Sequence, residues 1–279
     1  NVLKKAGVSR VSIGIQSFQD EELKAIKRRP RQNTIYQALD DIRQMDFPYF
    51  NIDLIYGIKG QTVESFLYSL EEALRFQPNE LFIYPLYVRQ GTGITEREPD
   101  DVCFRMYRAA CKLLQAKGFL QTSMRRFIHH PSTDAEVSCG DEVMLSCGSG
   151  GRSYLGDLHY ATRYTVCQQC IAREIDEYMA TTDFTVARNG FILSAKEQQQ
   201  RFIIKNLMYY MGIDKAEYTR RFGEPLDRTP LFRQLAEQYW IEETPERIRL
   251  TPEGLGYSDY IGQLFITPEI RQLMETYSY

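Results

Sequence analysis

The sequence lacks an apolar segment long enough to cross a membrane. Its longest apolar run extends from Leu81 to Val88, whereas a membrane-spanning helix needs roughly 20 predominantly apolar residues. The first residues also lack the basic-then-apolar order of a secretory signal. We therefore expect a cytoplasmic protein that has no membrane partner.

A strong excess of charge of either sign is also missing. The 279 residues include 34 Lys and Arg and 37 Asp and Glu, which gives a net charge of -3. This balance provides no overall attraction to phosphate backbones or anionic lipid, so nucleic acid is not an expected partner. The length and a hydrophobic content of 43% allow one large domain and a smaller one.

Cysteine is present, but not in the pattern of a secreted disulfide protein. Six cysteines in a chain without a secretory signal predict reduced thiols or metal ligands. Cys139, Cys147, Cys167 and Cys170 place four thiols within 32 residues, so a zinc or cluster site is one alternative. We favour thiols that pack as small hydrophobic side chains, and we nominate no metal ligand.

The first half alternates short apolar runs with amphipathic stretches, a pattern typical of β/α units around a parallel sheet. Strands are predicted at 10–15, 49–56 and 80–88, with helices at 34–45, 63–76 and 101–117. Ser17 and Asp20 resemble a capping box that opens a further helix ending near Lys27. Thr62 is expected to cap the helix that begins at Val63.

The second half predicts a different organisation. Short strands near 119–123, 143–146 and 153–155 precede a helix at 166–179, and capped helices begin after Phe191. Three helices and a strand at Arg247–Leu250 resemble a winged helix, whose common use is DNA binding. The third of these helices offers little beyond Arg233 for a DNA groove, so we favour a packing role. The predicted domains are 1–182 and 191–279.

Asp53 is the most informative residue because it interrupts an otherwise apolar strand. A buried, unpaired carboxylate is costly, so we expect a cation, backbone donors or a ligand beside it. A structural ion pair or a solvated strand face is the alternative. Gln16 ends the preceding strand and can both donate and accept hydrogen bonds. Ligands of α/β barrels bind at the carboxyl ends of the strands, where such side chains are useful.

Two sequence blocks carry a resemblance to a known family. Gly-Ile-Gln-Ser-Phe at 14–18 and Asn-Ile-Asp-Leu-Ile-Tyr-Gly-Ile-Lys-Gly-Gln-Thr at 51–62 resemble the paired motifs of oxygen-independent coproporphyrinogen oxidases and related radical S-adenosylmethionine (SAM) heme chaperones. Leu-Thr-Pro-Glu-Gly at 250–254 extends the similarity toward the end of the chain. The resemblance implies the carboxy-terminal part of a partial (β/α)6 barrel, followed by a small helical, winged-helix-like domain.

The resemblance also implies roles for individual residues. Gln16 would approach the SAM ribose or a second SAM molecule, Asp53 would accept hydrogen bonds from the ribose hydroxyls, and Arg28 would meet the methionyl carboxylate. Tyr87 falls at the strand end that contacts the same ligand, and Arg152 falls where the family supplies backbone contacts. The family's proline after its Tyr-Gly-Leu sequence is Lys59 here, and we expect Gly57 and Gly60 to retain the turn.

By the same resemblance, the complete protein would bind SAM and a [4Fe-4S] cluster. Its substrate would be a small organic molecule, with a tetrapyrrole as one candidate, and its electron donor a flavodoxin or ferredoxin. The family's three-cysteine loop, C-x3-C-x2-C, has no counterpart in this sequence. Since the chain also begins at Asn1 just ahead of a strand, we expect the cluster ligands upstream. We expect these 279 residues alone to be unable to cleave SAM to a 5′-deoxyadenosyl radical.

Two alternatives remain open at this stage. One is a heme-binding chaperone on the same fold, although His129, His130 and His159 are the only imidazoles and thiolates can also bind heme. The other is a catalytically silent member of the family that is retained for its interactions.

Overall fold

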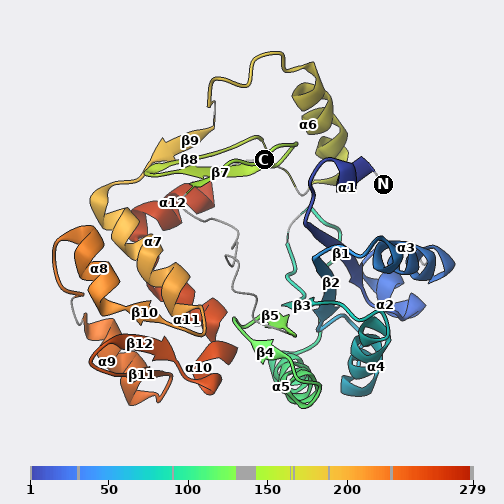
Figure 1. The fold of residues 1–279 in the computed structure, drawn as a ribbon, viewed down its shortest axis with the longest axis horizontal. Coiled ribbons are helices and arrows are strands. Elements are labelled where there is room, and N and C mark those ends of the chain that lie inside the picture. Colours follow the sequence, from blue (N-terminus) through green and yellow to red (C-terminus); the bar gives the residue numbers. More distant parts are fainter. Residues whose placement is uncertain are drawn as a thin grey trace. The chain divides into compact units, whose positions relative to one another are not determined.

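The computed structural model describes residues 2–29, 32–89, 91–129, 143–163, 165, 167–187, 189–226 and 229–276. The chain forms two compact units (Figure 1). The first consists of residues 1–89 and 93–131, and the second of residues 90–92 and 132–279. No helix in the described part of the chain combines the length and the apolar character that crossing a bilayer requires.

A five-stranded sheet in the order β1-β2-β3-β5-β4 forms the first unit. Strands β1, β2 and β3 are parallel, whereas β5 and β4 pair antiparallel at one edge. The strands are β1 (Arg10–Gln16), β2 (Tyr49–Tyr56), β3 (Glu80–Pro85), β4 (Leu120–Gln121) and β5 (Arg126–Ile128). The mixed α/β class is therefore confirmed, and the described residues form an open sheet rather than a closed barrel.

Helices cover one face of this sheet (Figure 1). The helices of this unit are α1 (Val2–Lys5), α2 (Asp20–Ala25), α3 (Gln32–Met45), α4 (Val63–Leu74) and α5 (Asp100–Ala116). Ile52, Leu54 and Leu81 are fully buried in one core with Phe66 of α4 and Met106 of α5. Because strand side chains alternate between faces, the residues between these apolar positions lie on the opposite face.

The turns at the ends of β1 and β2 differ in how well the sequence predicts them. Thr62 caps α4, and its side chain and that of Ser65 form the reciprocal bonds of a capping box. Gly57 and Gly60 both adopt positive φ, at 82° and 85°, so the turn is retained with Lys59 inside it. The predicted Ser17 capping box is wrong. Helix α2 begins after Gln19, because the Ser17 hydroxyl already bonds to other groups.

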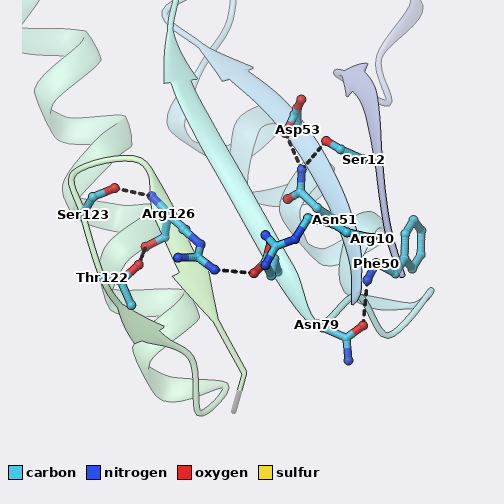
Figure 2. A network of polar contacts seen from close by, with 10 residues as sticks. Arg10, Ser12, Phe50, Asn51, Asp53, Asn79, Thr122, Ser123 and Arg126 are labelled. Atoms are coloured by element: carbon cyan, nitrogen blue, oxygen red, sulfur yellow. Dashed lines mark hydrogen bonds and ion pairs between the residues drawn. The ribbon is translucent and has the colours of Figure 1, made fainter. Parts of the chain in front are cut away.

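A buried ion cluster joins three strands on the face opposite the helices. Glu80 of β3 is 3% exposed, and its two carboxylate oxygens accept bonds from Arg10 Nη1 of β1 at 2.6 Å and Arg126 Nη2 of β5 at 2.5 Å. Figure 2 shows Arg10 and Arg126 within this polar network. The cluster therefore ties the antiparallel edge of the sheet to its first strand.

The second unit contains two antiparallel sheets. One has the order β6-β7-β8-β9 and the other β10-β12-β11. Their strands are β6 (Val143–Met144), β7 (Arg152–Leu155), β8 (Leu158–Ala161), β9 (Gly190–Ile192), β10 (Ile213–Asp214), β11 (Ile241–Glu243) and β12 (Arg247–Leu250). The helices are α6 (Gln168–Ala180), α7 (Ala195–Leu207), α8 (Lys215–Phe222), α9 (Pro230–Glu237), α10 (Pro252–Gly256), α11 (Ser258–Leu264) and α12 (Pro268–Thr276).

The carboxy-terminal helices surround a hydrophobic core of their own, whose members lie between Phe202 and Phe265. Ser194 and Glu197 form a capping box that opens α7, and Thr251 caps α10 ahead of its first-turn proline. The division between the two units falls at residues 131 and 132. The domain boundary between 182 and 191 and the likeness to a winged helix stay predictions about the second unit.

Replacement of Glu80 by alanine tests the ion cluster. It leaves the Arg10 and Arg126 guanidinium groups without their shared carboxylate, so we expect the free energy of unfolding to fall by about 3 kcal/mol. Urea denaturation measures this change. The matched control is Glu21→Ala, because the Glu21 side chain is 84% exposed and pairs with the exposed Lys24. Equal small effects of the two variants would contradict a structural role for the cluster.

Candidate functional site

Gly14 and Asp53 are neighbours across the parallel pair of strands β1 and β2. Residues paired in this way point to the same face of a sheet, about 4.8 Å apart. Asp53 therefore faces away from the covering helices, on the side where Gly14 has no side chain. The absence of a Cβ at Gly14 leaves space beside the carboxylate.

Gln16 turns its amide back over Gly14. Its φ of 73° lies in the left-handed region that non-glycine residues rarely adopt. The strand register shifts between Gly14 and Gln16, as in a β-bulge. A Cβ built on Gly14 would collide with Nε2 of Gln16, so the amide covers the glycine on the face that Asp53 shares. Because it covers Gly14 on this face, the Gln16 amide lies on the same side of the sheet as the Asp53 carboxylate. Gln16 is 8% exposed.

A short polar chain orients the Asp53 carboxylate. Nδ2 of Asn51 donates to Asp53 Oδ1 at 2.6 Å and to Ser12 Oγ at 2.6 Å. Figure 2 shows Asn51 between these two side chains. Burial raises the pKa of Asp53 above its ordinary value, and hydrogen bonds from Asn51 and Ser12 offset part of that rise. Neutral donors therefore hold the carboxylate in place.

Arg28 reaches the same glycine from the turn after α2. Its Nη1 donates to the backbone carbonyl of Gly14 at 3.3 Å, and the side chain is exposed. A guanidinium has five N–H donors, and this bond, the one that the Arg28 side chain makes among the described residues, leaves donors for an anionic ligand. Gln16, Arg28 and Asp53 thus converge around Gly14, although they come from three separate parts of the chain.

The other two predicted residues lie on other elements of the chain. Tyr87 follows the end of β3, is 41% exposed, and accepts a hydrogen bond from Arg125 Nη2 at 2.6 Å. Arg125 also lies over the Tyr87 ring, 5.6 Å from its centroid. Arg152 begins β7 and belongs to the second unit. Roles for these two residues at the site remain predictions.

Glu22 is a buried residue that the sequence did not single out. It is 6% exposed, and its carboxylate accepts bonds from the Ser17 hydroxyl at 2.6 Å and from the Ser65 hydroxyl at 2.5 Å. Nε2 of Gln61 donates to it at 2.8 Å. These bonds tie the turn after β1 to the turn after β2, so Glu22 fixes the backbone immediately next to Gln16.

Ser12 and Asn51 were also missed, although the sequence contains a signal for them. Both alternate with apolar residues along their strands, and the alternation assigns them to the face of Asp53. Glu22 has a weaker signal, because an acidic residue in the first turn of a helix is common on a solvated surface.

The three converging groups suit a ligand with several polar parts. A carboxylate accepts bonds from paired hydroxyls, a guanidinium binds a carboxylate in a fork, and an amide can do either. Gln16 lies at the carboxyl end of β1 and Asp53 in the carboxyl-terminal half of β2. Ligands of open α/β sheets bind at this edge of the sheet.

Family models match both ends of the chain. A Radical SAM superfamily model matches residues 1–73, which include Gln16, Arg28 and Asp53. A HemN C-terminal domain model matches residues 193–256 in the second unit. The predicted family resemblance is thus confirmed.

Curated relatives carry two different names. The heme chaperone HemW of Bacillus subtilis is 26% identical over an alignment of 280 positions, gaps included, that covers 94% of this chain and 72% of the relative. The oxygen-independent coproporphyrinogen III oxidase of Thermostichus vulcanus is 25% identical over 274 residues, covering 90% of this chain and 83% of that protein.

A solved structure shares the fold. The coproporphyrinogen III oxidase HemN of Escherichia coli, described as a radical SAM enzyme, matches with a TM-score of 0.74 over 95% of this chain. The sequences are 21% identical, so this likeness concerns the fold. The chain spans 65% of that solved chain, less than two thirds of it.

The raised pKa of Asp53 predicts how Asp53→Asn changes stability. A carboxyl with a raised folded pKa loses stability as pH rises from the ordinary aspartate pKa of about 3.9 through its own value. The substituted amide keeps an acceptor for Asn51 but carries no charge. We therefore expect the variant to be more stable than wild type at pH 7, with a difference that shrinks toward pH 4.

Urea denaturation at both pH values measures this effect, with the exposed Asp40→Asn as the control. A loss of stability in Asp53→Asn at pH 7 would instead indicate a structural carboxylate.

Proposed function

We propose that this chain, a radical SAM protein of the group that includes oxygen-independent coproporphyrinogen III oxidases and heme chaperones, binds SAM at the carboxyl ends of β1 and β2. The observation that supports the proposal is the convergence of Gln16, Arg28 and Asp53 around Gly14. Each of the three groups matches a different part of a nucleoside amino acid.

The Asp53 carboxylate is the ribose contact in this proposal. A carboxylate has about four acceptor positions, and Asn51 and Ser12 are the side chains that bond to it among the described residues. Acceptor positions therefore remain for two ribose hydroxyls. Asp53 is only partly buried, so a ligand can reach it without displacing the sheet.

Arg28 and Gln16 complete the site. The exposed Arg28 guanidinium would bind the methionyl carboxylate with charge-assisted bonds. The Gln16 amide lies over Gly14 and would hydrogen-bond to the ribose or to a second SAM molecule. Glu22 would act as a positioning residue, because its bond to Ser17 fixes the residue that follows Gln16.

The cluster that such a protein uses would be bound by residues outside those described. Among the residues that the structure describes, no group of three or more His, Cys, Asp or Glu side chains is placed to hold a metal. When bound, the cluster would supply the electron that cleaves SAM to a 5′-deoxyadenosyl radical, for hydrogen abstraction from an organic substrate. A tetrapyrrole substrate, a flavodoxin or ferredoxin as electron donor, and a cytoplasmic location belong to the proposal for the whole protein.

SAM affinity tests the proposed site. Asp53→Asn should weaken SAM binding at least tenfold, because a hydrogen bond to a charged group contributes about 1.5–3 kcal/mol and about 1.4 kcal/mol corresponds to tenfold. Gly14→Ala should weaken it comparably by displacing the Gln16 amide. Isothermal titration calorimetry under anaerobic conditions measures both, on protein that retains any segment preceding Asn1 and has its cluster reconstituted.

The control is Gly262→Ala, because a Cβ added to Gly262 meets no atom within 4 Å. Thermal unfolding of all three variants separates loss of binding from loss of folding. Unchanged SAM affinity in Asp53→Asn would remove Asp53 from the site.

Transport of heme is the second candidate, favoured by the name of the Bacillus subtilis relative. His159 of β8 is partly buried between Tyr154 and Phe191, and burial lowers its pKa, which favours the neutral imidazole that a heme ligand requires. His130 lies outside the described residues. Anaerobic heme titration should give a stoichiometric Soret shift if the protein carries heme, and His159→Ala should abolish that shift. Absence of a shift, together with SAM cleavage, would favour the enzyme.

A further inference from the structure

Cys167 and Cys170 lie side by side at the start of helix α6. Their sulfur atoms are 3.2 Å apart, and both side chains are partly buried. Cys167 occupies the N-cap position of this helix, and Cys170 lies in its first turn. Two thiols at this separation can form a disulfide, whose S–S bond is about 2.05 Å, with a small change of rotamer.

The two thiols are not equivalent. The Cys170 thiol donates its hydrogen to the Cys167 sulfur, which is therefore the acceptor of the pair. Cys167 also lies at the amino-terminal end of a 13-residue helix, where the helix dipole favours negative charge. The bond to Cys167 raises the pKa of Cys170, and the nearby Arg173 guanidinium opposes that rise. These features favour Cys167 as the nucleophile and Cys170 as the thiol that stays protonated.

The surroundings distinguish this pair from the other described cysteines. Burial raises the pKa of the Cys103 thiol and raises the pKa of the Cys111 thiol to about 11, so both stay protonated at neutral pH. Cys147 is exposed, and no contact among the described residues joins it to a second sulfur. The pair at the start of α6 is thus the place where the described chain brings two thiols together.

A metal site explains the pair less well. Zinc and iron–sulfur sites need three or four protein ligands, and no such group of His, Cys, Asp and Glu occurs in the described ranges. Cys139, which the sequence suggested as a further ligand, lies outside those ranges. Two sulfurs alone are sufficient for dithiol chemistry.

We propose that Cys167 and Cys170 form a redox-active dithiol that reacts with small-molecule disulfides such as oxidised glutathione. The proposal is independent of the proposed SAM site, because neither cysteine is among the residues proposed to bind SAM.

The reaction balances with one glutathione disulfide. The Cys167 thiolate attacks a glutathione sulfur, the glutathione S–S bond breaks, and one glutathione thiolate leaves. Cys170 then gives up its proton and attacks the Cys167 sulfur, which releases the second glutathione. The protein dithiol is oxidised by two electrons to a disulfide, and the oxidised glutathione is reduced to two glutathione molecules.

The oxidation state of the pair can be measured on one tryptic peptide. Cleavage after Arg163 and Arg173 releases both cysteines in the peptide 164–173. The native protein is equilibrated anaerobically in glutathione buffers of graded redox ratio, quenched with acid and alkylated. Mass spectrometry should then show this peptide either doubly alkylated or unalkylated and two hydrogens lighter. A peptide with glutathione on both cysteines, or a peptide that stays doubly alkylated in oxidised buffer, would overturn the proposal.

Single variants test the order of attack. Cys170→Ser should accumulate a mixed disulfide between glutathione and Cys167, at least tenfold faster than Cys167→Ser forms one at Cys170. The control is Cys147→Ser, which should leave the equilibrium of the 164–173 peptide unchanged. Equal rates in the two single variants would contradict the assignment of Cys167 as nucleophile.

Discussion

Gly14 and Asp53 pair across β1 and β2, and the geometry of the candidate site depends on this pairing. The glycine has no side chain, so the Gln16 amide can fold over it and the Arg28 guanidinium can reach its carbonyl. Asp53 is fixed beside it by Asn51 and Ser12. A Cβ at position 14 would collide with the Gln16 amide, so the proposed sharing of one ligand by the three polar groups depends on one small residue.

The division of the sheet into two faces explains why the site can exist in a stable fold. One face buries Ile52, Leu54 and Leu81 under α4 and α5, and this burial supplies the driving force for folding. The opposite face can therefore carry polar groups, provided that each is satisfied. In the ion cluster near the beginnings of the strands, Arg10 and Arg126 pair with both carboxylate oxygens of Glu80. The Asp53 group lies nearer the carboxyl ends, where it stays partly accessible to a ligand.

The sequence predicted the elements whose signals are local, and it failed where the deciding contact is distant. Thr62 and Ser194 form the capping bonds that their spacing indicates. Ser17 has similar spacing, but its hydroxyl donates to Glu22 instead. Glu22 also accepts bonds from Gln61 and Ser65, which lie 39 and 43 residues after it in the sequence. Strands β5, β8, β9, β10 and β11, each of two to four residues, were not predicted, and each is paired with a partner strand that is distant in the sequence or equally short. Asp53 and Gln16 could be named from the sequence, but the positive φ of Gln16, whose amide lies back over Gly14, could not.

A crystal structure with SAM bound, determined anaerobically on the protein with its cluster, tests the central claim most directly. The account predicts both ribose hydroxyl oxygens within about 3 Å of the Asp53 carboxylate oxygens, the separation of a hydrogen bond. It also predicts the methionyl carboxylate beside the Arg28 guanidinium. A ribose bound elsewhere, with Asp53 still bonded only to Asn51 and Ser12, would contradict it.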